Sequence, residues 1–98
     1  MSLRDLGNRV GNWQRQVSAL QLRVMALRAI NQQHLAAADA IRLKREIVQG
    51  LEMSRREWAT HSVPAPRRTL VEKSCAQLLD ALADIERSSG PIELDLDT

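Results

Sequence analysis

Residues 6–27 read LGNRVGNWQRQVSALQLRVMAL, and apolar residues recur in this stretch at alternating steps of four and three. This spacing returns an apolar residue to the same side of a helix at each turn, as in the a and d positions of a coiled-coil seam. The seam consists of Leu6, Val10, Trp13, Val17, Leu20, Val24 and Leu27. Ser2, with Asp5 three residues later, provides a helix start, so the pattern predicts a helix that begins near Leu3.

A second apolar stripe begins before the seam ends and continues at a mean step of 3.6 residues. It contains Leu22, Met25, Ala29, Gln33, Ala36, Ala40, Leu43, Ile47, Leu51, Ser54 and Trp58. At about 100° per residue, this stripe lies about 170° around the helix from the seam. One helix over 3–60 would use the two stripes on different partners, whereas a turn at 31–34 would fold both inward. We favour the single helix because residues 31–34 contain no Gly or Pro.

The boundary after residue 60 is marked by two prolines in the sequence HSVPAP, residues 61–66. Proline disfavours a helix interior, so we expect an extended connector over 61–68. Thr69 and Glu72 then resemble a capping box, and Gly90 with Pro91 would end the next helix near residue 88. Its apolar face contains Val71, Cys75, Leu78, Leu82 and Ile85, so it should pack antiparallel on the second stripe.

The chain is therefore expected to be all-α, with a long amino-terminal helix, possible interruption near 31–34, and an antiparallel carboxy-terminal helix over 70–88. The arrangement is a helical hairpin or a three-helix bundle, and residues 1–90 form its single domain. The last seven residues hold three acids and no base, so the preceding 91 residues, with 14 bases and nine acids, carry a charge of +5. We expect the acidic tail, 91–98, to be disordered when free.

Composition also bears on the compartment and on chemistry. No apolar run approaches the about 20 residues of a membrane span, and one cysteine suits a reducing, cytoplasmic location. The histidines, His34 and His61, stand 27 residues apart without a nearby group of cysteines or acids. Cys75 lies within an apolar stripe, which is typical of a buried and inert thiol. We therefore predict no catalytic, metal-binding or cofactor-binding residues, and no enzyme activity.

The preferred hypothesis is a protein interaction module, such as a helical adaptor, a chaperone-like subunit or an inhibitor. Its partner surface would be the seam with Arg9, Arg23 and Arg28 at its edges, because an uncovered apolar seam marks a binding surface. The four arginines between Asp5 and Asp39, with no acid among them, suit a partner with an acidic surface. Pairing of the seam with a second copy would give a dimer, and pairing with another protein a hetero-complex.

The alternative is a small dimeric nucleic-acid-binding regulator, because arginines outnumber lysines 12 to two. The cations that would contact phosphates are Arg42, Lys44, Arg45, Arg55 and Arg56. Two features weigh against it. Arg42 and Glu46, like Glu52 and Arg56, stand at the four-residue spacing of ion pairs on a helix, and no Phe or Tyr is present for base stacking.

Overall fold

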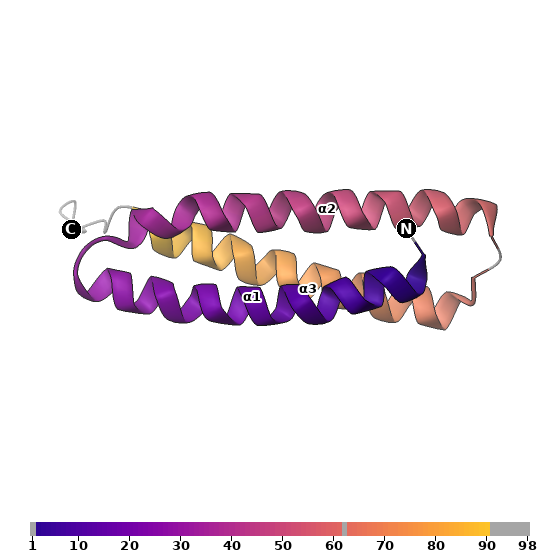
Figure 1. Cartoon of the computed structure of the whole chain (residues 1–98), viewed down its shortest axis with the longest axis horizontal. Coiled ribbons are helices and arrows are strands. Elements are labelled where there is room, and N and C mark those ends of the chain that lie inside the picture. Colours follow the sequence, from indigo (N-terminus) through magenta and orange to yellow (C-terminus); the bar gives the residue numbers. More distant parts are fainter. Residues whose placement is uncertain (1, 62, 91–98) are drawn as a thin grey trace, which may run out of the picture.

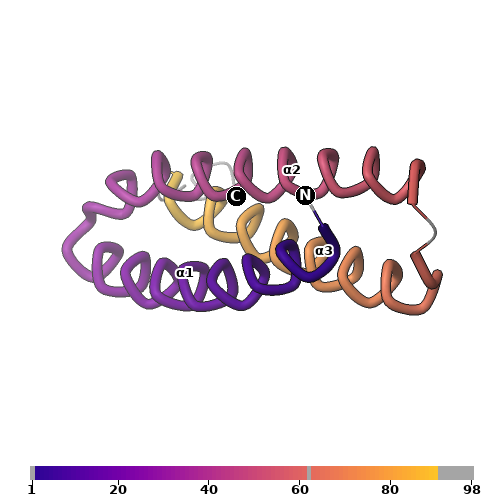
Figure 2. Tube along the Cα trace, turned by 45° about the vertical axis from the view of Figure 1, so that its right-hand side comes forward, coloured from indigo at the N-terminus to yellow at the C-terminus, as the bar shows by residue number. Residues whose placement is uncertain are grey.

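The computed structural model describes residues 2–61 and 63–90, which form three long helices and one short 3-10 turn packed side by side (Figure 1). The helices are α1 (Leu3–Ala29), α2 (Ala37–Thr60) and α3 (Ala65–Ser89), and the 3-10 turn η1 spans Gln33–Ala36. α1 and α3 run in the same direction and α2 runs in the opposite one (Figures 1 and 2). The expected all-α fold is confirmed, in the form of an up-down-up three-helix bundle.

The start of α1 is as expected from the sequence. Ser2 has an extended backbone, and its Oγ accepts a hydrogen bond from the backbone N–H of Asp5 at 3.1 Å. One of the free amides of the first turn is thereby satisfied, and the Asp5 carboxylate lies near the positive end of the helix dipole. The helix then continues for 27 residues to Ala29.

The single helix over 3–60 is wrong, because the chain reverses direction between α1 and η1. Asn31 adopts a left-handed backbone with φ of 57°, a conformation that asparagine tolerates better than most residues. The N–H of Gln32 donates to the Leu27 carbonyl at 2.8 Å, and the N–H of Asn31 donates to the Arg28 carbonyl at 3.1 Å. This is the Schellman arrangement that ends many helices, with asparagine where glycine is commonest. The absence of glycine and proline was therefore a misleading sign of continuity.

The expected connector over 61–68 is also too long. α3 begins at Ala65, and the carbonyl of Pro64 accepts hydrogen bonds from the N–H groups of Arg67 and Arg68 at 3.2 and 3.3 Å. Pro66 fits within the first turn because the amide that proline lacks would have no helical partner there. Thr69 therefore lies inside α3 and does not cap it, while the predicted end near Gly90 is correct.

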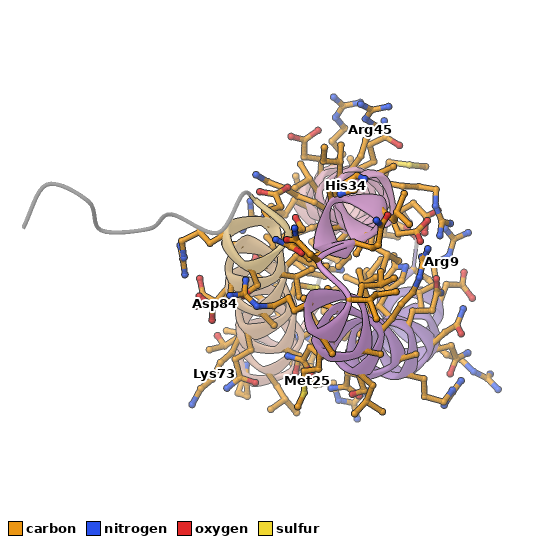
Figure 3. All side chains as sticks on the ribbon, turned by 90° about the vertical axis from the view of Figure 1, so that its left-hand side faces the viewer. Arg9, Met25, His34, Arg45, Lys73 and Asp84 are labelled. Atoms are coloured by element: carbon orange, nitrogen blue, oxygen red, sulfur yellow. The ribbon has the colours of Figure 1, made fainter. Side chains whose placement is uncertain are left out.

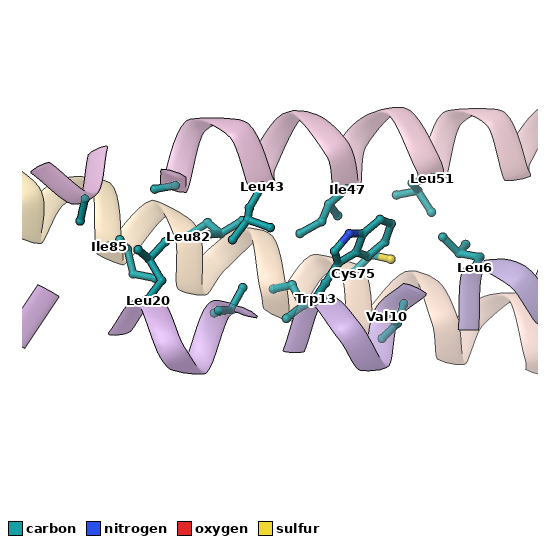
Figure 4. Packing of buried hydrophobic residues seen from close by; sticks show 14 of the residues in the cluster. Leu6, Val10, Trp13, Leu20, Leu43, Ile47, Leu51, Cys75, Leu82 and Ile85 are labelled. Atoms are coloured by element: carbon teal, nitrogen blue, oxygen red, sulfur yellow. The ribbon is translucent and has the colours of Figure 1, made fainter. Parts of the chain in front are cut away.

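The core runs the length of the bundle between the three helices (Figure 4). It contains six seam residues of α1, the second stripe from Ala36 onward, and Cys75, Leu78, Leu82 and Ile85 of α3. The indole of Trp13 extends toward α2 between Ile47 and Leu51 (Figure 4). α2 and α3 pack antiparallel, as expected. The first members of the second stripe, Leu22, Met25 and Ala29, lie on the exposed side of α1, because the chain reverses just beyond them.

Candidate protein interaction site

The seam of α1 is the inner face of the helix and not a free surface. Leu6 is fully buried, and the least buried of Val10, Trp13, Val17, Leu20 and Val24 is only 7% exposed. Leu27, at the end of the helix, is half-buried against the same core. The hypothesis that the seam lacks a cover within the chain is thus wrong, because α2 and α3 cover it. Any partner of the folded chain must bind elsewhere.

The three arginines predicted at the edges of the seam are exposed, and two of them contact other helices of the bundle. Arg23 forms an ion pair with Asp39 of α2, and an Nη of Arg28 donates to the Ser88 carbonyl of α3 at 2.7 Å. Arg9 lies beside Asp5, Asn8 and Met53 in a shallow groove between α1 and α2. Arg23 and Arg28 therefore link α1 to its two neighbours at the turn end of the bundle. These contacts occupy two of the three arginines that the sequence assigned to a partner.

The five cations of the nucleic-acid alternative point in different directions. Arg42 contacts Asp39 and Glu46 at 3.7 and 3.6 Å, on the side of α2 nearer α1. Lys44 contacts Glu86 at 3.9 Å and Arg55 contacts Glu72 at 3.1 Å, both across to α3. Arg45 and Arg56 are exposed, and within residues 2–61 and 63–90 neither forms an ion pair. The structure does not bring the five cations together on one face.

The outer side of α2 carries a group of apolar and basic residues that the sequence analysis did not single out. A surface groove of about 440 Å³ is lined by Ile41, Lys44, Arg45, Val48 and Gln49. We call these five residues the α2 groove. Ile41 is 48% exposed and Val48 is half-buried, and they lie one above the other because seven residues make two helical turns. Figure 3 looks along the bundle and shows Arg45 projecting from α2, far from α1 and α3.

The α2 groove has a mixed chemistry. Its floor is aliphatic, and the basic groups of Lys44 and Arg45 border it. Lys44 is shared with Glu86, whose side chain is 32% exposed, so this edge is partly neutralised. Arg45 supplies the more available charge. A complementary surface would present an apolar side chain to Ile41 and Val48 and a carboxylate to Arg45. The sequence contained a signal for this groove, since Ile41 and Val48 are aliphatic residues that fall outside the second stripe.

The remaining chemically reactive residues are distributed singly. Cys75 is fully buried, and burial raises the pKa of its thiol above the ordinary value, with a further rise from Glu72 and an opposing effect of Arg55. His61 follows the end of α2, where its Nδ1 lies 3.0 Å from the Thr60 hydroxyl, and His34 is exposed on η1. Within the described part of the chain, no three residues of the types His, Cys, Asp and Glu are placed to hold a metal ion together.

A search of the described helices finds none with the length and apolar character that a bilayer-spanning segment requires. The tail that was expected to be disordered, 91–98, falls outside the residues that the structure describes. Comparison of the chain with protein-family models, with curated proteins and with solved structures gave no match.

Proposed function

We propose that the chain is a non-enzymatic protein interaction module, acting as a helical adaptor, a chaperone-like subunit or an inhibitor, and that it binds its partner through the α2 groove. The observation that carries this proposal is the aliphatic strip of exposed Ile41 and half-buried Val48, which Lys44 and Arg45 border on one helix. An aliphatic strip with a basic border is the counterpart of an amphipathic helix that has acidic flanks. The proposed partner therefore presents an apolar ridge with acidic residues beside it.

The charge of the chain supports an acidic partner. Residues 1–91 carry a charge of +5, and Arg45 and Arg56 stand three helical turns apart along the exposed side of α2. Exposed charges at the border of an interface raise the association rate and favour partners of opposite sign. Aliphatic contacts in the middle then contribute most of the affinity. Binding should accordingly weaken with salt but persist at high ionic strength.

Site-specific photo-crosslinking in the cells that make this chain provides the test. A photoreactive residue in place of Val48 should link the chain to a protein with an acidic surface. The matched control places the same group at Asn12, an exposed position of α1 on the other side of the bundle. Arg45→Glu should reduce the Val48 adduct at least tenfold, because it opposes the acidic partner. Equal labelling from both positions, or an adduct that Arg45→Glu leaves unchanged, would contradict the proposal.

The rival proposal, a dimeric nucleic-acid-binding regulator, has less support. Three of its five cations, Arg42, Lys44 and Arg55, each lie within 4 Å of a carboxylate on the same chain. Phosphate binding would have to displace these acids, and counterion release from two remaining cations supplies little affinity. Titration of generic duplex DNA at about 50 mM salt distinguishes the proposals, because a phosphate-binding protein loses affinity steeply as salt rises. Tight binding with that steep loss would favour the rival.

A further inference from the structure

We infer that the acidic tail, residues 91–98, folds back and occupies the α2 groove of its own chain. The tail follows Gly90, the last residue that the structure describes, and its sequence is PIELDLDT. Composition alone predicts a disordered tail because it takes no account of a surface that could bind it. The docking needs no partner and is independent of the proposed function. Only its consequence, competition between the tail and a partner for the groove, rests on that function.

The tail starts beside the amino-terminal end of α2. Gly90 follows the last residue of α3, and its carbonyl accepts a hydrogen bond from the Nε2 of Gln33 in η1 at 3.2 Å. Near the end of α3, Glu86 lies 3.9 Å from the ammonium of Lys44, a residue of the groove. Figures 1 and 2 show the same arrangement, with the end of α3 beside the start of α2. The tail therefore leaves the bundle next to the groove.

Gln33 presents an unfilled acceptor at this starting point. Its side chain is 3% exposed, and among the described residues its buried Oε1 has no hydrogen-bond donor. A buried acceptor without a donor is unfavourable. Gly90 has an extended backbone with ψ of 171°, and Pro91 has no N–H, so Ile92 carries the first backbone donor of the tail. In an extended chain the Gly90 carbonyl and the Ile92 N–H point to the same side, so one amide can bind both.

The tail is long enough to cover the groove. Along the axis of α2, Ile41 lies about 13 Å beyond Gln33 and Val48 about 10 Å farther, from the rise per residue of 3-10 and α-helices. An extended chain advances about 3.3 Å per residue, so residues 91–98 reach about 26 Å. Three apolar residues alternate within the tail over about 13 Å, which exceeds the distance between Ile41 and Val48. The three are Ile92, Leu94 and Leu96.

The tail also has the chemistry that the groove requires. Its apolar residues alternate with three acids, and it contains no base. Alternation places the two kinds of side chain on opposite sides of an extended chain, so the apolar side can face Ile41 and Val48. The acids then point away from the floor, where the long side chains of Lys44 and Arg45 at its border can reach them. The acids are Glu93, Asp95 and Asp97.

Attachment to the chain favours the tail over a free segment of the same chemistry. A short linker gives an effective concentration on the order of millimolar, so an equally weak affinity covers the groove for much of the time. Arg45 adds to this affinity because, within residues 2–61 and 63–90, it has no ion pair to give up. On α1, by contrast, Arg23 and Arg28 near this end of the bundle already bind Asp39 and the Ser88 carbonyl.

The first test locates the tail with a nitroxide on Thr98→Cys, in a Cys75→Ala background that leaves no second thiol to label. The amide NMR signals of Ile41, Arg45 and Val48 should broaden and lose intensity. The matched control is the exposed side of α1 level with the groove, which the ion pair between Arg23 and Asp39 identifies. Its signals, which should keep their intensity, are those of Gln14, Ser18 and Gln21.

Variants then test the two sides of the tail. Leu94→Ser with Leu96→Ser should restore the intensity of the groove signals, because the apolar contact with the floor is lost. Arg45→Glu should restore it as well, because a carboxylate in the groove opposes the acids of the tail. The matched control is Arg56→Glu, which should not restore it. Arg56 is also exposed but lies about 16 Å farther along α2, beyond the reach of the tail.

Three outcomes of these measurements would overturn the docking. Equal loss of intensity at the groove and at the α1 control would mean that the tail has no preferred surface. Loss at the α1 arginines in place of the groove would put the tail on another side of the bundle. The third is loss in a mixed sample in which the isotope-labelled chain carries no nitroxide, because the tail of a second copy would then be the occupant.

The competition with a partner is measured by the Val48 photo-crosslink. Leu94→Ser with Leu96→Ser should raise the yield of the adduct by at least about twofold, because a tail that covers the groove half of the time halves the apparent affinity of a partner. An unchanged yield would overturn the competition. Broadening at the groove without any adduct would support the docking and count against the proposed function alone.

Discussion

The inner and outer sides of α1 both contain apolar residues at helical spacing, but only the inner side is buried. The seam has a large apolar residue at each of its seven positions, from Leu6 to Leu27. On the outer side, the residues at this spacing, which we call the outer stripe, are Gly7, Gly11, Gln14, Ser18, Leu22, Met25 and Ala29. Only Leu22 and Met25 among them are large and apolar. Burial of a Leu or Val side chain contributes about 1.5–3 kcal/mol, so the seam gains several times more from facing the core. The difference shows that an unbroken row of large residues, more than apolar spacing alone, determines which side of a helix faces inward.

The largest expected difference between the two sides of α1 is the loss in free energy of unfolding when a charge replaces a leucine on each side. Leu20 is 5% exposed and packs in the core cluster that includes Leu82 and Ile85. Leu20→Asp should lower the free energy of unfolding by more than about 4 kcal/mol, because an unpaired carboxylate would be buried. Leu22→Asp, two residues away and exposed, should change it by less than about 0.5 kcal/mol.

Urea unfolding followed by circular dichroism measures both variants, at a concentration where light scattering finds only monomer so that association does not contribute. A marginal domain of this size would be largely unfolded by Leu20→Asp. Similar losses for the two variants would mean that both sides of α1 are buried in the folded chain.

An intermediate effect is expected at the Asn31 turn, which returns the chain along the inner side of α1 and leaves its outer side exposed. Asn31 holds a φ of 57°, which costs a β-branched residue more than it costs asparagine. Asn31→Val should therefore lower the free energy of unfolding by about 1–2 kcal/mol, and Asn31→Gly should leave it unchanged or raise it slightly. Thermal unfolding of the three chains provides the comparison. If the valine variant unfolds at the same temperature as the glycine variant, the left-handed turn does not limit stability.

Much of the fold could be predicted from the sequence because its causes are local. The capping Ser2, the seven apolar positions of the seam and the end of α3 at Gly90 all depend on residues a few positions apart. The reversal near Asn31 agrees with the alternative of a turn at 31–34, but this alternative was not the favoured one, since asparagine adopts the left-handed turn without the glycine that usually marks it. The start of α3 was placed too late for a related reason, because Pro66 is compatible with a first helical turn.

The candidate interaction site was less accessible to sequence reasoning. Whether the seam is covered depends on the return of α2, and hence on one backbone conformation at Asn31. If the helix were unbroken, Leu22 and Met25 would belong to the same stripe as Leu43 and Ile47. Because the chain reverses, Leu22 and Met25 lie on the exposed surface of the bundle, while Leu43 and Ile47 lie in its core. The ion pairs of Arg23 and Arg55 join residues 16 and 17 positions apart, beyond the range of helical spacing. Which surfaces stay exposed can therefore be stated only after this long-range packing is known.

The smallest expected effect concerns the buried thiol of Cys75. Cys75 is fully buried near Trp13 of the seam (Figure 4), and burial is the main cause that raises the pKa of its thiol. Because the folded pKa lies above the unfolded value, folding favours the neutral thiol. This contribution to stability is fully present below the unfolded pKa of about 8.5 and is lost as pH rises through the folded pKa. The free energy of unfolding should thus fall more steeply above about pH 9 in the natural chain than in Cys75→Ala, by at most about 1.4 kcal/mol per pH unit.

Thiol labelling compares the buried thiol of Cys75 with an exposed thiol on the outer stripe, without unfolding the chain. At neutral pH, Cys75 should react with a thiol reagent only through opening of the bundle, because its sulfur is inaccessible and the raised pKa of its thiol reduces the thiolate fraction. A thiol on the outer stripe, in Ser18→Cys with Cys75→Ala, should react at least about a hundredfold faster, at the rate of an unfolded peptide. Fast labelling of Cys75 in the folded chain would show that the inner side of the bundle opens far more readily than its packing implies.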